Sequence, residues 1–258
     1  MQTAQINGTT IAFSDTGGSG PAVILSHGYL MDHTMFDSQV AVLKDDYRVI
    51  TWDERGFGGT HAPGEFTYWD SAKDVLALMD YLGIENAVVG GMSQGGYLSL
   101  RTALTAPKRV RALILIDTQA GPEDASKVEP YHQLMAAWNA HGSKSVQDII
   151  AGIILGPGSW QAWFDKWEHL PVEQLNFAFD CLMNRDDITT RMGEINCPTL
   201  IVHGTADASI PIAMAEVLRD KIAGKTTMTI IEGAPHAANI THAEQVNKAI
   251  VKFLSELG

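Results

Sequence analysis

Apolar runs and amphipathic stretches alternate along most of this chain. Runs that are apolar throughout are typical of strands buried on both sides, and they occur at residues 22–25, 112–117 and 199–202. Similar or mixed runs predict further strands at 48–52, 87–89 and 226–231. Apolar residues at helical spacing predict helices at about 35–44, 69–82, 97–104, 212–223 and 246–254. Strands that alternate with helices predict a parallel sheet with helices on both faces.

The pattern changes at two places. Near the N-terminus, Asn7-Gly8 lies between two alternating runs, which is the strongest short signal for a β-hairpin. Between residues 123 and 190 no run has the pattern of a buried strand, and this segment holds four of the six tryptophans. We interpret it as a helical insertion that covers the strand ends. The predicted organisation is therefore an α/β core of residues 1–121 and 191–258 with a helical cap at 122–190.

Composition and charge narrow the class of protein. A chain of 258 residues with 45% hydrophobic content can form one large core. Its net charge of −12 should repel nucleic acid and anionic membranes, so neither is an expected partner. No apolar stretch approaches the length of a membrane span and the start lacks a signal-like pattern, so we expect a cytoplasmic protein. The oligomeric state is open, with a homo-oligomer among the options.

The motif Gly91-x-Ser93-x-Gly95 stands between a predicted strand and a predicted helix. Glycines on both sides permit a turn tight enough to project a serine hydroxyl beyond the sheet edge. The motif alone is weak evidence, because an ordinary glycine-rich turn has the same appearance. Its position between a buried strand and a helix is what makes Ser93 a candidate nucleophile.

Two more polar residues follow predicted strands, Asp207 after 199–202 and His236 after 226–231. Ligands of parallel sheets bind at the carboxyl ends of the strands, where these side chains should meet. A serine needs a base to accept its proton, and a histidine can act as that base when a carboxylate orients it. Asp117 also follows a strand and is an alternative acid.

With these motifs in place, the sequence resembles the alpha/beta-hydrolase family over nearly its whole length. The resemblance rests on His27-Gly28-Tyr29, Asp53-x-Arg55-Gly56-x-Gly58, Gly91-Met92-Ser93-Gln94-Gly95-Gly96, His203-Gly204-x-x-Asp207-x-x-x-Pro211 and Gly233-x-x-His236. It implies the alpha/beta-hydrolase fold, with a mostly parallel central sheet, helices on both faces and a helical cap. It also implies the site residues: nucleophile Ser93, acid Asp207, base His236, and an oxyanion hole of the Tyr29 and Gln94 amides. The spacing from His203 to Asp207 and Pro211 favours Asp207 over Asp117.

Differences between this sequence and several branches of the family reduce the number of reactions that we expect it to catalyse. Relatives that open halides or epoxides carry aspartate where this chain has Ser93. Leu30-Met31 stand where peracid-forming relatives commonly have a proline and carbon–carbon hydrolases a Gly- and Ser-rich run. We therefore expect a carboxylesterase-type serine hydrolase that cleaves esters of small apolar acyl or alkyl groups through an acyl-enzyme. This chemistry needs no metal or other cofactor, so none is expected.

Two alternatives remain open. Asp32-x-x-Met35-Phe36-x-x-Gln39 resembles the corresponding segment of 3-oxoadipate enol-lactonases, so the small-molecule substrate is an ester or a lactone. The other alternative is a ligand receptor that keeps the triad but turns over slowly. The aromatic cap motivates the apolar preference, and the residues expected to line the substrate pocket are Leu30, Met92, Trp138, Trp160, Trp163 and Ile210.

Overall fold

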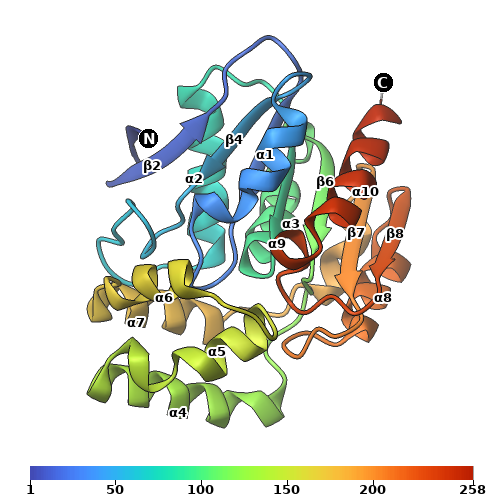
Figure 1. Ribbon diagram of the computed structural model, residues 1–258. Coiled ribbons are helices and arrows are strands. Elements are labelled where there is room, and N and C mark those ends of the chain that lie inside the picture. Colours follow the sequence, from blue (N-terminus) through green and yellow to red (C-terminus); the bar gives the residue numbers. More distant parts are fainter. Residues whose placement is uncertain (258) are drawn as a thin grey trace.

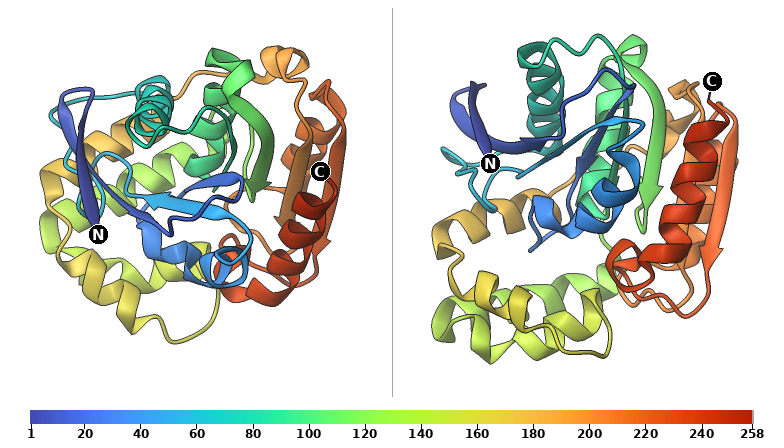
Figure 2. Two further views of the ribbon diagram at one scale, coloured as in Figure 1. Left: turned by 90° about the horizontal axis from the view of Figure 1, so that it is seen from above. Right: turned by 45° about the horizontal axis from the view of Figure 1, so that its top comes forward.

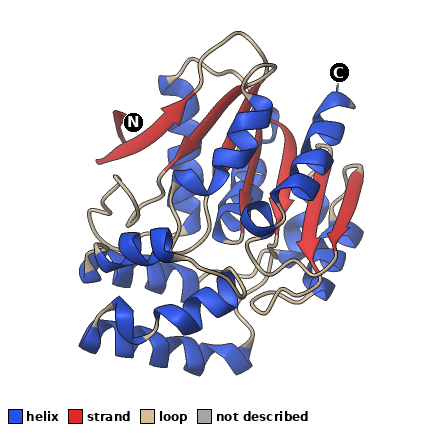
Figure 3. Cartoon of the chain, viewed as in Figure 1, coloured by secondary structure: helices blue, strands red, loops and turns tan. Residues whose placement is uncertain are grey.

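An eight-stranded, mostly parallel sheet forms the centre of the computed structural model, which describes residues 1–257 (Figures 1 and 3). The strands are β1 (Gln2–Ile6), β2 (Thr9–Asp15), β3 (Ala22–Ser26), β4 (Arg48–Trp52), β5 (Ala87–Met92), β6 (Val110–Ile116), β7 (Thr199–Gly204) and β8 (Thr226–Ile231). They lie in the order β1-β2-β4-β3-β5-β6-β7-β8. This arrangement confirms the predicted fold class.

The predicted N-terminal hairpin forms the one antiparallel part of the sheet. Strands β1 and β2 pair through a turn in which Asn7 and Gly8 have φ values of 48° and 80°. Positive φ at both positions matches the right-handed twist of the paired strands. Strand β2 also runs antiparallel to β4, whereas β3 to β8 pair in parallel.

Helices cover both faces of the sheet, as the alternating pattern predicts (Figure 2). On one face α1 (Asp37–Leu43) packs against α9 (Ala238–Thr241) and α10 (Ala243–Ser255). On the other, α2 (Tyr68–Tyr81) packs against α3 (Gln94–Thr105), while α8 (Ile212–Lys221) packs on β7. Short 3₁₀ turns at His33–Phe36 and Pro107–Arg109 complete the core. Within residues 1–257, no helix has both the length and the apolar character needed to cross a bilayer.

The segment after β6 is helical and lies across one end of the sheet. It contains α4 (Ala125–His141), α5 (Gln147–Ile154), α6 (Gln161–Glu168) and α7 (Val172–Met183), with 3₁₀ turns at Ser143–Ser145 and Thr189–Glu194. Figure 1 shows the arrowheads of β6, β7 and β8 pointing toward it. The carboxyl ends of the parallel strands therefore face the insertion, and any group at those ends lies beneath it.

Tryptophan packing joins the helices of the insertion to one another and to the core. The Trp138 and Trp167 rings lie 6.4 Å apart between centroids, and Phe164 is 5.6 Å from Trp167. The Trp167 indole nitrogen donates a 2.7 Å hydrogen bond to the carbonyl oxygen of Leu30, in the loop after β3. These aromatic residues therefore stabilise the attachment of the insertion.

Candidate active site

Ser93 occupies a strained turn between β5 and α3. Its φ of 52° and ψ of −114° lie outside the regions that residues other than glycine ordinarily adopt. A Cβ atom at Gly91 would lie 2.5 Å from the carbonyl oxygen of Ser26, and one at Gly95 would overlap the same oxygen. Only glycine fits at both positions. The glycines of Gly91-x-Ser93-x-Gly95 are therefore required because α3 lies very close to β3. That close approach also forces the sharp turn at Ser93.

The backbone of this turn is fixed by its neighbours. The carbonyl oxygen of Ser93 accepts hydrogen bonds from the amides of Gly96 and Tyr97 and from the Thr118 hydroxyl, at 2.7 Å for the last. The amide of Ser93 donates to Ile116 at the end of β6. Four hydrogen bonds thus hold the main chain of this turn, and the side chain of Ser93 lines a cavity.

Asp207 and His236 form a hydrogen-bonded pair on neighbouring loops. Their loops follow β7 and β8, and the distance from His236 Nδ1 to Asp207 Oδ2 is 2.8 Å. Both side chains are buried, with 5% of His236 and 1% of Asp207 exposed. Burial alone would raise the pKa of Asp207, but His236 and the amide of Ile210 lower it below its ordinary value. Asp207 therefore stays ionised beside the imidazole.

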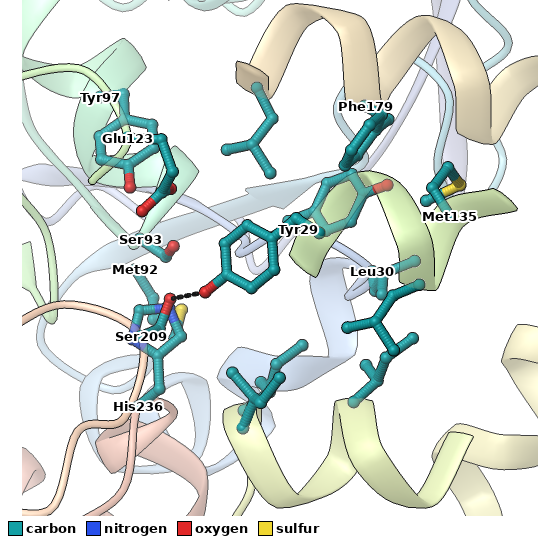
Figure 4. Close-up of a pocket in the computed structure, with 16 residues that line it drawn as sticks. Tyr29, Leu30, Met92, Ser93, Tyr97, Glu123, Met135, Phe179, Ser209 and His236 are labelled. Carbon is teal, nitrogen blue, oxygen red and sulfur yellow. Dashed lines mark hydrogen bonds between the residues drawn. The ribbon is translucent and has the colours of Figure 1, made fainter. Parts of the chain in front are cut away.

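Ser93 and His236 line the same cavity (Figure 4). Because His236 Nδ1 faces Asp207, its Nε2 is the nitrogen left to accept a proton. Among the described residues, Ser93 and His236 are not joined by a direct hydrogen bond. Bonds of this kind are commonly long or misaligned until substrate binds. The structure thus brings the three predicted residues to one rim of the sheet.

The two residues predicted to form an oxyanion hole lie near Ser93. Gln94 is the first residue of α3, so its amide has no acceptor within the helix and lies at the positive end of the helix dipole. Its side chain turns away, and Oε1 accepts a 3.3 Å hydrogen bond from Tyr68. Tyr29 lines the cavity and precedes Leu30, whose φ of 63° redirects the loop after β3.

His27 supports that loop. Its Nδ1 lies 2.8 Å from the carbonyl oxygen of Gly28, and its Nε2 accepts a 2.9 Å hydrogen bond from the amide of Glu54. Burial lowers the pKa of His27, so the imidazole is neutral, with one nitrogen donating and the other accepting. The ring ties the loop after β3 to the loop after β4.

Asp117, the alternative acid, has a different set of partners. One carboxylate oxygen accepts a 2.8 Å hydrogen bond from the amide of Gly204, and the other accepts a 3.2 Å bond from the amide of Ala238. Burial, reinforced by the charge of Asp207, raises the pKa of Asp117 well above its ordinary value. Asp117 therefore joins the loops that carry Asp207 and His236 without itself contacting the imidazole of His236.

Asp117, His203 and Asp207 also form a cluster with the spacing of metal ligands. Each offers one ligand atom, and these atoms lie within 4.8 Å of one another. However, Asp207 already pairs with His236, while His203 Nε2 lies 2.9 Å from the carbonyl oxygen of Ile210. A bound metal would compete with both contacts, so the donor set fits a buried polar network better than a metal site.

The cavity beside Ser93, together with the solvent-open space at its mouth, contains about 730 Å³ not filled by atoms. Its apolar wall comes largely from the insertion and consists of Leu30, Met92, Leu134, Met135, Ile150, Ile153, Ile154, Phe179 and Leu182. Besides Ser93, the polar residues that line it are Tyr29, Tyr97, Glu123, Tyr131, Ser209 and His236. Figure 4 shows Tyr97 and Glu123 on the same side of the cavity as Ser93.

Four of the predicted pocket residues lie elsewhere. Trp138 packs on Trp167, and the Trp160 indole donates to the carbonyl oxygen of Gly156. Trp163 faces a separate cleft, where the Lys166 ammonium lies 4.4 Å from its ring centroid. Ile210 is buried in the core. Only Leu30 and Met92 line the cavity as predicted.

The sequence contains one local signal for the wall residues that were not predicted. Ile150, Ile153 and Ile154 share one face of α5 because they recur at helical spacing. That spacing identifies an apolar face, but it cannot show whether the face meets the core or a cavity.

Helix α4 makes hydrogen bonds to the loop that carries Asp207. The Lys127 ammonium donates to the carbonyl oxygens of Ala208 and Ser209 at 2.8 and 2.5 Å. The Tyr131 and Ser209 hydroxyls lie 3.4 Å apart, shown as the dashed line in Figure 4. The Asp207 carboxylate in turn accepts hydrogen bonds from the amides of Ser209 and Ile210. The insertion thus helps to hold the loop of Asp207 in place, and it also forms part of the cavity wall.

Glu54, in the loop after β4, is expected to make the stability of the protein depend on pH. Its carboxyl oxygens are buried and have no hydrogen-bond partner within residues 1–257, and burial raises its pKa to about 8. The unfolded chain releases this proton near pH 4.5, so the free energy of unfolding should fall as the pH rises from there to about 8. The slope from this group is about 1.4 kcal/mol per pH unit.

Exchanging Glu54 for glutamine removes that titration. We expect the advantage in unfolding free energy of Glu54→Gln over the unaltered protein to grow by about 3 kcal/mol between pH 5 and pH 8. Urea unfolding at both pH values measures this difference. Glu65→Gln, at an exposed position, is the matched control and should track the unaltered protein. Equal pH slopes for Glu54→Gln and the unaltered protein would refute the prediction.

Comparison with known proteins agrees with the fold and the motifs. The family profile described as alpha/beta hydrolase fold matches residues 21–148. A protein of Synechocystis sp. that carries a non-heme chloroperoxidase name is 30% identical over 97% of this chain and 97% of its own length. The structure of a thermophilic esterase from Thermogutta terrifontis has a TM-score of 0.90 and 28% identity, covering 100% of this chain and 99% of that one.

The structure of a lactone-cleaving enzyme is about as similar to this chain as that of the esterase. The enol-lactonase from Burkholderia xenovorans has a TM-score of 0.90 and 26% identity, covering 98% of this chain and 100% of that one. Whole-length similarity to hydrolases of different specificity identifies a common scaffold rather than a substrate. From the fold, the motifs and these relatives together, the chain belongs to the alpha/beta-hydrolase family.

Proposed function

We propose that this protein is a carboxylesterase that cleaves esters of small apolar acyl or alkyl groups through an acyl-enzyme. One observation carries the proposal: Ser93, on a strained turn, lines the same cavity as His236, whose Nδ1 lies 2.8 Å from Asp207. A hydroxyl, an imidazole and an ionised carboxylate in this relation are the parts of an activated serine nucleophile.

The reaction follows from these positions. His236 Nε2 takes the Ser93 proton while Oγ attacks the ester carbonyl carbon, and the amides of Tyr29 and Gln94 stabilise the charge that develops on oxygen. His236 then gives the proton to the leaving alcohol, and an acyl-enzyme remains on Ser93. A water molecule, deprotonated by His236, attacks this acyl group and releases the acid. Asp207 stabilises the imidazolium in both halves of the reaction.

The wall of the cavity supports the apolar preference. Leucine, isoleucine, methionine and phenylalanine side chains form most of it, and apolar area removed from water contributes about 25 cal/mol per Å². A short alkyl chain would gain about 0.8 kcal/mol for each methylene group that it buries there. The insertion thus supplies the binding energy, while the core loops supply the chemistry.

Lactone hydrolysis is the first alternative, supported by the enol-lactonase likeness and by the segment from Asp32 to Gln39. A lactone that carries carboxylates would require cations in the pocket. The insertion's four cations each have other partners and none lines the cavity; they are Lys127, Lys144, Lys166 and Arg185. The described cavity is therefore better suited to an uncharged ester or lactone.

An oxidative reaction is the second alternative, because the Synechocystis relative carries a chloroperoxidase name. Peracid-forming members of the family commonly have a proline soon after the His-Gly pair. Here Leu30 occupies that stretch with a φ of 63°, a value that the ring of proline forbids. This loop geometry favours hydrolysis.

A panel of 4-nitrophenyl esters tests the proposal. We expect efficient turnover of the acetate and butyrate, with kcat/KM highest for butyrate and lower for decanoate, as the proposed preference for small acyl groups requires. A slow ligand receptor would instead release about one equivalent of 4-nitrophenolate and then nearly stop. Absence of turnover with every ester, or a strong preference for charged esters, would refute the esterase.

A further inference from the structure

Glu123 is the one side chain with a full negative charge on the wall of the described cavity. It lies in the connection between β6 and α4, and its side chain is 6% exposed. Figure 4 shows it beside Tyr97, on the same side of the cavity as Ser93. A charged group that is so well removed from bulk water acts strongly on whatever binds next to it.

The counter-ion of Glu123 stands behind it. Arg185 Nη2 lies 3.3 Å from Glu123 Oε2, a single contact rather than a bidentate pair, and Glu123 Oε1 accepts a 3.1 Å hydrogen bond from the amide of Asp124. The remaining donors of Arg185 bind the carbonyl oxygens of Gly121 and Leu182 at 3.1 and 2.7 Å. Arg185 does not line the catalytic cavity but borders a different groove, next to Asp186.

This arrangement makes the pair a fixed dipole with its negative end toward the cavity. The guanidinium is held in place from several sides, including the Tyr97 ring, whose centroid lies 4.5 Å from Arg185 Cζ. Arg185 therefore cannot turn to meet a substrate without losing these contacts. Glu123 lines the cavity, whereas no lysine or arginine of the described residues does.

We propose that Glu123 determines substrate charge in this enzyme. It repels esters that carry a carboxylate near the reacting carbonyl, and it accepts esters that carry a hydrogen-bond donor there, a hydroxyl or an ammonium group. This inference rests on the proposed esterase activity and refines its substrate class. It also gives a physical reason why a carboxylate-bearing lactone would be a poor substrate.

Three methyl esters of matched shape test the proposal at pH 7, with acid release followed in a pH-stat. Methyl butyrate is neutral, methyl β-alaninate places an ammonium group where butyrate has its terminal methyl group, and monomethyl succinate places a carboxylate there. Exchanging Glu123 for glutamine should raise kcat/KM for the succinate about tenfold and lower it for the β-alaninate about tenfold. The butyrate value should change less than either of the other two and is the reference for both, because a neutral chain has no charge to interact with Glu123.

The control is Glu129→Gln, an exposed position on α4 whose carboxylate binds only Gln133 among the described residues. It should leave all three values unchanged. If Glu123→Gln folds poorly because Arg185 loses its partner, the double variant Glu123→Gln with Arg185→Gln removes both charges. It should change the succinate to β-alaninate ratio in the same direction by a smaller factor.

The outcomes separate the two proposals. If the unaltered protein hydrolyses none of the three esters, the esterase itself is refuted. If it hydrolyses methyl butyrate but Glu123→Gln changes all three values in parallel, or none of them, the esterase stands and the role of Glu123 is refuted. Opposite changes for succinate and β-alaninate support the role, because a purely structural effect would not depend on substrate charge.

Discussion

Exchanging Ser93 for alanine is expected to lower kcat for 4-nitrophenyl butyrate by about 10⁶-fold. The oxygen that would form the acyl-enzyme is lost, and His236 and Asp207 cannot act on the ester without it. The fold should survive, because alanine can occupy the same backbone turn and the contacts that hold the turn are made by the main chain. Initial rates over long incubations measure the residual activity, and circular dichroism reports the fold.

Ser209 offers a matched control within the same cavity. Its hydroxyl lies 3.4 Å from that of Tyr131, and its backbone does not have the strained turn of Ser93. Ser209→Ala should therefore retain activity within about tenfold, since it removes at most one weak hydrogen bond. An organophosphate should add to Ser93 in the unaltered protein and in Ser209→Ala, as mass spectrometry of peptides would show. Labelling at Ser209, or near-normal turnover by Ser93→Ala, would contradict the assignment of the nucleophile.

The elements of the core could be predicted because their signals are local. An apolar run such as 112–117 has no polar face, and Asn7-Gly8 specifies its own turn, so neither depends on distant residues. The turn at Ser93 could also be predicted, since glycines at 91 and 95 are required by the contact with Ser26. A parallel sheet then places the loops after its strands at one edge. That rule is enough to bring Ser93, Asp207 and His236 together.

The cavity wall could not be predicted in the same way. Large aromatic residues in the insertion can serve either a pocket or the packing between helices, and here Trp138 and Trp167 serve the packing. The apolar face of α5 became the wall because of how α5 lies against α4 and the core. Glu54 is similar, since nothing in its neighbours along the chain shows that its carboxyl is buried. These features depend on tertiary packing, which the sequence pattern does not determine.

Exchanging Asp207 for asparagine is expected to lower kcat by about 10⁴-fold. Asparagine keeps the shape of the side chain, but it removes the charge that holds the proton on His236 Nδ1 and stabilises the imidazolium. The same exchange at Asp117 should cost much less, at most about tenfold in kcat. Asp117 accepts backbone hydrogen bonds from Gly204 and Ala238 and does not contact the imidazole of His236.

Asp117→Asn should lose more stability than Asp207→Asn, which is the reverse of their expected order in lost kcat. Asp117→Asn offers one acceptor oxygen to two amides, and an unsatisfied buried donor costs about 1 to 3 kcal/mol of unfolding free energy. Asp207→Asn should lose less stability and far more rate, because its remaining oxygen can still accept from the amides of Ser209 and Ile210. Measuring kcat and thermal unfolding on both variants therefore separates chemistry from structure. If Asp117→Asn lost the larger share of the rate while Asp207→Asn remained active, the acid would have to be reassigned to the end of β6, and the 2.8 Å contact to His236 would be only structural.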